Sequence, residues 1–148
     1  MTREQLIVWA AGFFDGEGSV GLSRSHTGGK VVHLRIRAGQ RIREPLERLV
    51  MLWGGTIRLR APRDGYGQFY EWALSNRGSA LALADMEPFL IVKLSQARLA
   101  REFMTGIGQP GGTRGPGKGN GPLSEEETER REALREAIHV LNQGGKQD

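Results

Sequence analysis

The sequence predicts a single α+β domain in which a four-stranded antiparallel sheet is covered by helices on one face. Four short segments alternate apolar and polar residues, as strands do, and the segments between and after them have helical apolar spacing. A chain of 148 residues supplies one hydrophobic core but not comfortably two. The expected order of elements is αββαββαα, followed by one extra C-terminal helix.

The first expected element is a helix that runs to about Gly16. Thr2 followed by Gln5 has the pattern of a capping box, which starts a helix. Gly12 and Gly16 lie one turn apart in it, and each glycine costs about 1 kcal/mol in a helix relative to alanine. Small residues at this spacing let a second helix approach closely. We therefore expect this face to contact another backbone, most simply a second copy of the same helix.

Two pairs of strands and a helix between them are expected next. The strands span 19–25, 31–39, 56–61 and 69–74, and an amphipathic helix spans 45–53. A turn signal, Asp64-Gly65, joins the last two strands. The residues expected to face the core are Val20, Leu22, Val32, Leu34, Ile36, Ala38, Ile57, Leu59, Tyr70, Trp72 and Leu74.

Helices are expected over 79–86 and 91–104. Ser124 and Glu127 form a second capping-box pattern, which begins a tail helix expected to pack on the helical side of the sheet. The stretch before it is rich in glycine and proline, as flexible connections are. The expected organisation is a core over 1–104, a linker over 105–122, and a C-terminal helix and tail over 123–148.

Composition excludes several classes of protein. The chain has no cysteine, which excludes disulfides and thiolate metal sites. No apolar run reaches ~18 residues, and the first residues lack a signal-peptide pattern, so we expect no membrane partner. An intracellular setting is expected, in a bacterial cytoplasm or an organelle.

Basic residues are concentrated in one part of the chain. The net charge is +4, but residues 24–63 hold ten basic side chains against two acidic ones, whereas 123–148 hold seven acidic against four basic. The outward face of the predicted strands is dominated by arginine, whose planar fork reads guanine edges in the major groove. Double-stranded DNA is therefore the expected partner. The residues expected to bind it are Ser23, Ser25, His33, Arg35, Arg37, Arg58, Arg60 and Glu71.

Residues 10–18, Ala-Ala-Gly-Phe-Phe-Asp-Gly-Glu-Gly, resemble the motif that names the LAGLIDADG homing endonucleases. Ala11 and Gly12 match its second and third positions, and Glu17 stands at its metal-binding acid; Ala10 replaces the leading leucine. The resemblance extends over about residues 4–104. It implies the single-motif, homodimeric type, with a saddle-like sheet. The residues implied at the dimer interface are Ala11, Gly12 and Gly16.

The resemblance also implies an activity. Such a protein is encoded in an intron or other mobile element and makes metal-dependent double-strand breaks in a long, nearly palindromic target. Two-fold symmetry would bring two Glu17 carboxylates together, which suits Mg²⁺ or another divalent cation. By resemblance, Gln40 positions the attacking water and Lys93 stabilises charge on the phosphate, so the implied catalytic residues are Glu17, Gln40 and Lys93. Asp15 is expected to support the end of the helix rather than bind metal.

Strand length sets the expected size of the target. Nine or ten residues at ~3.3 Å each span roughly 30 Å, close to one DNA turn of ~34 Å. Two copies would therefore follow about 20 base pairs.

Two alternatives share the fold: a maturase that binds intron RNA, and a DNA-binding regulator without catalysis. A structural or protein-interaction module is a third class, which the basic sheet face disfavours. The joint presence of Glu17, Gln40 and Lys93 favours cleavage.

Overall fold

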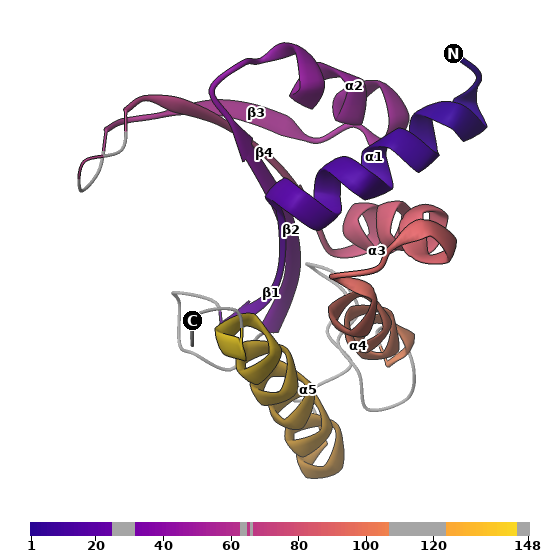
Figure 1. The fold of residues 1–148 in the computed structure, drawn as a ribbon. Helices are drawn as coiled ribbons and strands as arrows, with labels where there is room; N and C mark the ends of the chain where they lie inside the picture. Colours follow the sequence, from indigo (N-terminus) through magenta and orange to yellow (C-terminus); the bar gives the residue numbers. More distant parts are fainter. Residues whose placement is uncertain (25–31, 63–64, 66, 107–123, 145–148) are drawn as a thin grey trace, which may run out of the picture.

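The computed structural model describes residues 1–24, 32–62, 65, 67–106 and 124–144, and it confirms the predicted fold class (Figure 1). The strands pair antiparallel in the order β1-β2-β4-β3, so β2 and β4 are central. The elements are α1 (Arg3–Glu17), β1 (Gly18–Arg24), β2 (Val32–Gln40), α2 (Glu44–Trp53), β3 (Thr56–Arg60), β4 (Phe69–Ser75), α3 (Asn76–Met86), the 3-10 turn η1 (Glu87–Phe89), α4 (Leu94–Thr105) and α5 (Glu125–Gln143).

The pairing register separates the two faces of the sheet. Ile36 lies opposite Val20 on one side and Leu74 on the other, and all three are buried. Their neighbour Arg37 lies opposite Ser19 and Ala73 and points to the other face. Helices α1 to α4 lie against the first face (Figure 1). No described helix covers the second face, which we call the open face.

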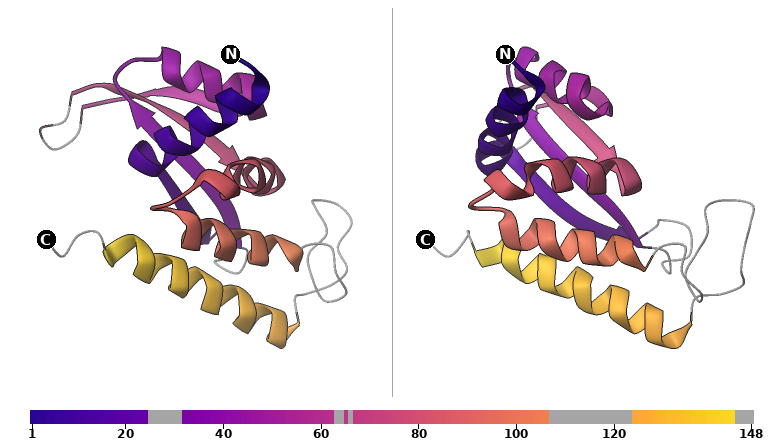
Figure 2. Two further views of the ribbon diagram at one scale, coloured as in Figure 1. Left: turned by 45° about the vertical axis from the view of Figure 1, so that its right-hand side comes forward. Right: turned by 90° about the vertical axis from the view of Figure 1, so that its right-hand side faces the viewer.

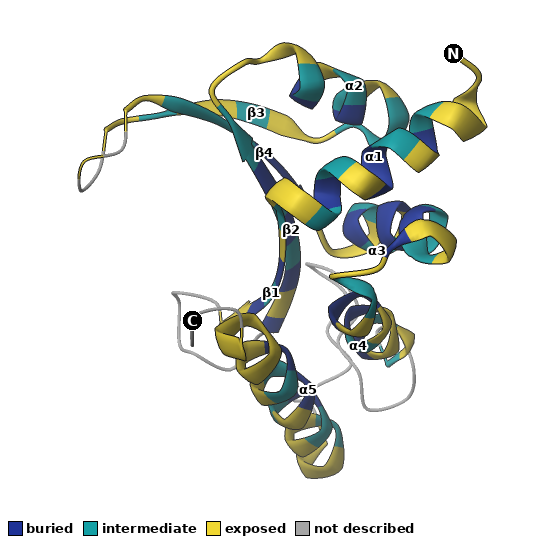
Figure 3. Cartoon of the chain, viewed as in Figure 1, coloured by how far each residue is buried: buried dark blue, intermediate teal, exposed yellow. Residues whose placement is uncertain are grey.

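The core lies between the sheet and these helices. The helix α1 begins with the predicted capping box at Thr2 and contributes the fully buried Phe14. Trp72 of β4 is also fully buried, and its indole N–H donates a 2.9 Å hydrogen bond to the carbonyl of Gly54. Figure 3 shows buried positions on the helix faces turned toward the sheet.

The structure corrects three expectations. Leu59 lies on the helix side of the sheet by register but is 53% exposed, because β3 and β4 extend past the helices there (Figure 1). The helix expected over 91–104 begins only at Leu94, and the three residues before it are held by hydrogen bonds from their backbone N–H groups to Asp15. Ser124 caps α5, but Glu127 does not complete the box; its carboxylate bonds to arginines of α5 instead.

The tail helix α5 lies beside α4, as expected (Figure 2), and it also contacts the edge strand β1 (Figure 1). Asn142 donates a 2.9 Å hydrogen bond to the carbonyl of Val20. Arg24 donates two hydrogen bonds to Glu132, at 3.0 and 2.8 Å. These bonds are the main reason that the pKa of Glu132 lies below its usual value. Arg24 therefore contacts the tail helix and is not part of the open face.

Ser25, Asp64 and most of the predicted linker lie outside the described residues. The division into core, linker and tail stays a prediction. Among the helices of the described residues, none is both long and apolar enough to cross a membrane.

Candidate active site and nucleic-acid interface

The candidate metal ligand Glu17 lies at the point where α1 turns into the sheet. Glu17 is the last residue of α1, and Gly18 begins β1. A side chain at Gly18 would overlap the ring of Phe14, so glycine lets the chain leave the helix close to the core. Glu17 is exposed, and no described residue donates a hydrogen bond to its carboxylate. Its oxygens are therefore available to a ligand.

The structure brings Gln40 and Lys93 to the same end of α1. Gly18 pairs with Ala38, so the end of β2 at Gln40 lies beside the start of β1. The amide oxygen of Gln40 accepts the backbone N–H of Arg41 at 2.8 Å, which leaves the NH₂ group of Gln40 to donate. The Lys93 ammonium donates a 2.9 Å hydrogen bond to the carbonyl of Asp15, two residues before Glu17.

Asp15 supports the end of α1, as the sequence indicates. Its carboxylate accepts three consecutive backbone N–H groups, those of Ile91 at 2.8 Å, Val92 at 3.1 Å and Lys93 at 3.0 Å. These bonds engage both of its oxygens, so Asp15 is the structural carboxylate of the motif and Glu17 the free one.

The glycine face of α1 has no partner in the part of the chain that the structure describes. A Cβ added at Gly12 or Gly16 would meet no heavy atom within 4 Å among the described residues. The helix therefore contains two unfavourable glycines that its own fold does not require. Ala11 was wrongly expected on this face: it is fully buried, because the core-facing stripe of α1 is Ile7, Ala10, Ala11 and Phe14.

Exposed apolar side chains flank the glycine face. Val8 lies one turn before Gly12 and is 45% exposed. Ile91 and Val92, held against the end of α1 by Asp15, are 84% and 66% exposed. The sequence reading missed Ile91 and Val92 because it placed them in a helix. Together with Gly12 and Gly16 they form an uncharged surface, as protein-protein interfaces do at their centres.

The open face of the sheet carries four arginines, as predicted. Arg35 and Arg37 of β2 and Arg58 and Arg60 of β3 share it by register. Burial and then the positive charge of Arg37 lower the pKa of Arg35, with Arg60 and Arg58 adding to this and Glu71 opposing it. The buried Nε–H of Arg35 has no acceptor among the described residues. This face is therefore positively charged, with donors left for an anionic or acceptor-rich partner.

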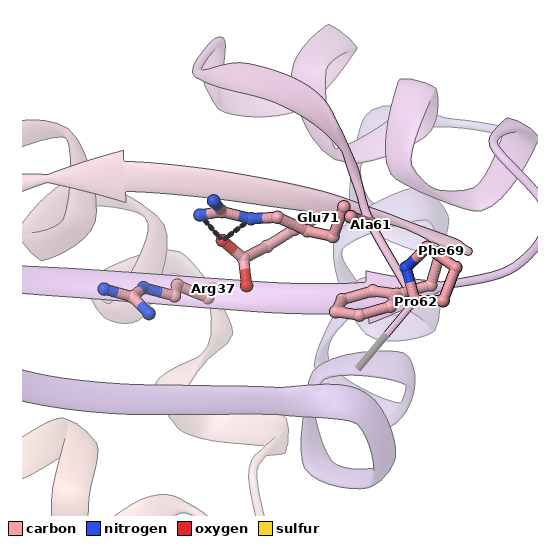
Figure 4. A pocket seen from close by; sticks show the side chains of 6 residues that line it. Arg37, Ala61, Pro62, Phe69 and Glu71 are labelled. Atoms are coloured by element: carbon pink, nitrogen blue, oxygen red, sulfur yellow. Dashed lines mark hydrogen bonds and ion pairs between the residues drawn. The ribbon is translucent and has the colours of Figure 1, made fainter. Parts of the chain in front are cut away.

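The two arginines of β3 differ in whether they form an ion pair with Glu71. It lies directly opposite Arg58 in the ladder, but its carboxylate accepts two hydrogen bonds from Arg60, at 2.7 and 3.2 Å (Figure 4). Arg60 is thereby held in one orientation, beside a hollow of about 460 Å³ that Arg37 and Phe69 also line. Arg58 is exposed and forms no ion pair with a described residue.

Other predicted DNA-binding residues lie on the same face. Ser23 and His33 are exposed and opposite each other on β1 and β2. A second hollow, of about 250 Å³, runs along β1 between Ser19 and Ser23 and is bounded by Arg35 and Arg37. Asn142 of α5 also lines it, a contribution that the sequence reading missed because only the folded chain brings α5 to β1.

Compared by sequence, the chain matches no protein-family model and no curated protein. Compared by structure, it is similar to the archaeal intron-encoded homing endonuclease I-Vdi141I complexed with DNA, with a TM-score of 0.73 and 22% identity over 95% of this chain and 86% of that chain. The homing endonuclease I-CvuI in complex with its target gives a TM-score of 0.71 and 18% identity over 94% and 83%.

A longer protein is similar as well. The LAGLIDADG meganuclease I-AabMI bound to uncleaved DNA gives a TM-score of 0.63 and 15% identity, over 87% of this chain but only 43% of that chain. These similarities agree with the element order, the strand order and the motif at residues 10–18. The chain therefore has the fold of the LAGLIDADG homing endonucleases.

Proposed function

We propose that this protein is a homodimeric, site-specific DNA endonuclease that makes metal-dependent double-strand breaks in a long, nearly palindromic target. The observation that carries the proposal is the Glu17 carboxylate: it has no hydrogen-bond partner among the described residues, and it lies where a glycine-faced helix meets a sheet with an arginine-rich face. The proteins of the same fold described above include homing endonucleases bound to DNA.

Two copies are proposed because one chain supplies only one Glu17, whereas the proposed double-strand break needs a metal-binding carboxylate from each of two subunits. The chain matches 43% of I-AabMI, so that longer chain has room for two such units. Gly12 and Gly16 leave an uncharged helix face on which a second α1 would pack closely. In a two-fold symmetric dimer both copies use the same surface, here the glycine face of α1. The Glu17 of each copy would then lie near the symmetry axis.

The donor set at the end of α1 fits a shared divalent cation. Within the described residues, no group of three or more acidic, histidine or cysteine side chains gathers to hold a metal. One exposed Glu17 per copy supplies a hard oxygen ligand, and two copies with DNA phosphate oxygens would supply several, as Mg²⁺ requires. When bound, the cation would activate water and neutralise charge on the phosphate.

The other two residues act through hydrogen bonds and charge. The NH₂ group of Gln40 is free to hold the attacking water at the sheet end, because its carbonyl is already bonded to Arg41. The Lys93 ammonium, close to the last turn of α1, would offset negative charge that develops on the phosphate.

The two arginines of β3 are expected to respond differently to mutation. Arg58→Ala should weaken binding to all DNA sequences alike and reduce the slope of log affinity against log salt by about 1, since an exposed, unpaired arginine suits phosphate. Arg60→Ala should relax the preference for one base pair in each half-site, at a cost of about 1–3 kcal/mol, because Glu71 holds its fork. Titrations at several salt concentrations with matched and mismatched sites measure both effects. Equal changes in slope and no change in base preference would contradict this assignment.

The whole proposal is tested by selecting cleaved sites from a randomised DNA library in the presence of Mg²⁺. We expect an inverted repeat of two similar half-sites, spanning about 20 base pairs. Binding without metal-dependent nicking would favour the non-catalytic regulator. Stronger binding to structured RNA than to any selected DNA would favour the maturase.

A further inference from the structure

Asp15 and Lys93 join the end of α1 to the start of α4 by two kinds of contact: the Asp15 side chain bonds to the backbone of Lys93, and the Lys93 side chain bonds to the backbone of Asp15. The Asp15 carboxylate lies at the N-terminal end of α4, where free backbone N–H groups and the helix dipole favour a negative charge. The cap residue of α4, Lys93, supplies no side-chain capping bond of its own. Asp15 therefore anchors the segment that leads into α4, and does so from another helix.

The contact in the other direction places a positive charge at the end of α1. No basic residue occupies the last turn of α1, although a cation there is favourable. The Lys93 ammonium takes this position by donating to the carbonyl of Asp15. Lys93 is half-buried, and its backbone and its side-chain nitrogen are both tied to residue 15.

We infer that Asp15 is a positioning residue for the reaction: it holds the segment 91–93 so that Lys93 stays at the end of α1 that carries Glu17. Glu17 lies two positions after Asp15 in α1, a rise of about 3 Å along the helix axis. The single side chain of Asp15 thus sets the relative position of the proposed metal ligand and the proposed charge-stabilising lysine. This inference rests on the proposed function.

The experiment compares Asp15→Asn, Lys93→Met and the double variant on the selected DNA site. Asn keeps one acceptor oxygen and leaves the carbonyl that binds the Lys93 ammonium in place, so any effect on Lys93 passes through the backbone of 91–93. We expect Asp15→Asn to slow single-turnover cleavage by about 100-fold, as a misplacement near 1 Å does. The dissociation constant of DNA, measured without divalent cation, should change by less than about 3-fold, roughly 0.6 kcal/mol.

The double variant distinguishes positioning from general support of the fold. If Asp15 acts through Lys93, the double variant cleaves no more slowly than Lys93→Met alone, because coupled residues are not additive. Asp85→Asn is the matched control: Asp85 of α3 is also a half-buried aspartate that joins its helix to others, through Arg3 of α1 and Trp53 of α2, but it lies away from the Glu17 end of α1. It should lower thermal stability and leave the cleavage rate unchanged.

Asp15→Glu, which keeps both acceptor oxygens, is the second variant in case Asp15→Asn does not fold. It should keep part of the wild-type cleavage rate, and the backbone amides of 91–93 should exchange hydrogen faster in it than in the wild-type protein. Cleavage by folded Asp15→Asn at the wild-type rate, or fully additive losses in the double variant, would overturn the inference alone. A wild-type protein that cuts no selected DNA would overturn the proposed function and this inference with it.

Discussion

Glu17→Gln is expected to abolish DNA cleavage while DNA binding is retained. The amide has the size of the carboxylate but no charge, so each copy loses its proposed hard ligand for the divalent cation. Loss of several kcal/mol of transition-state stabilisation corresponds to a rate decrease of roughly 1,000-fold or more. Because Glu17 forms no hydrogen bond with another described side chain, the fold should not change. Single-turnover cleavage, binding titration and thermal unfolding on one preparation measure all three properties.

Glu4→Gln provides the control for this substitution. Glu4 is an exposed glutamate in the first turn of the same helix, far from Gly18 along α1. Its replacement removes the same charge and should leave the cleavage rate unchanged. Full cleavage by the Glu17 variant would show that the metal site lies elsewhere.

Gly12→Leu is expected to separate the dimer while making each subunit more stable. A Cβ at Gly12 meets no atom of the described residues of its own chain within 4 Å, and leucine favours a helix over glycine by roughly 0.5–1 kcal/mol. Between two chains the same side chain would separate the closely packed helices. Overpacking costs about 1–3 kcal/mol at each site. Because the dimer contains the substitution twice, its dissociation constant should rise by roughly 100-fold or more.

Sedimentation velocity over a range of concentrations tests dimer dissociation, and thermal unfolding of the dissociated subunit tests the gain in stability. Cleavage of the full inverted repeat should be lost in parallel. Ala133→Leu adds similar bulk at an exposed position of α5 and should change neither property. A Gly12→Leu protein that stays dimeric and active would refute the proposed contact between the two α1 helices.

The arrangement of the sheet was predictable because a strand places alternate residues on opposite faces. The inward residues of β2, from Val32 to Ala38, are buried as expected, and its arginines lie on the open face. The error at Ala11 was avoidable: small size suggested an interface, but helical spacing groups Ala11 with Ile7 and Phe14 on the core side. Periodicity was the better guide than residue size.

The contacts that complete the site were not predictable, because they join residues far apart in the chain. Nothing near Asp15 in the sequence indicates that it binds the backbone of 91–93, or that the lysine returns the contact. The ladder could bring Glu71 near the arginines of β3, but the choice of Arg60 over Arg58 depends on side-chain conformation. The approach of Asn142 to β1 depends on how α5 packs in three dimensions.

Because β3 extends beyond the helices, its residues can be substituted during evolution with little effect on the fold. No residue of β3 is fully buried, and Leu59 between its two arginines faces solvent. Substitutions at exposed sites without special contacts usually alter stability by less than about 0.5 kcal/mol. New side chains at this end of the sheet can therefore be tried at little risk to folding. If the protein binds DNA as proposed, a lineage carrying it could acquire a different recognition sequence while its core residues stayed the same.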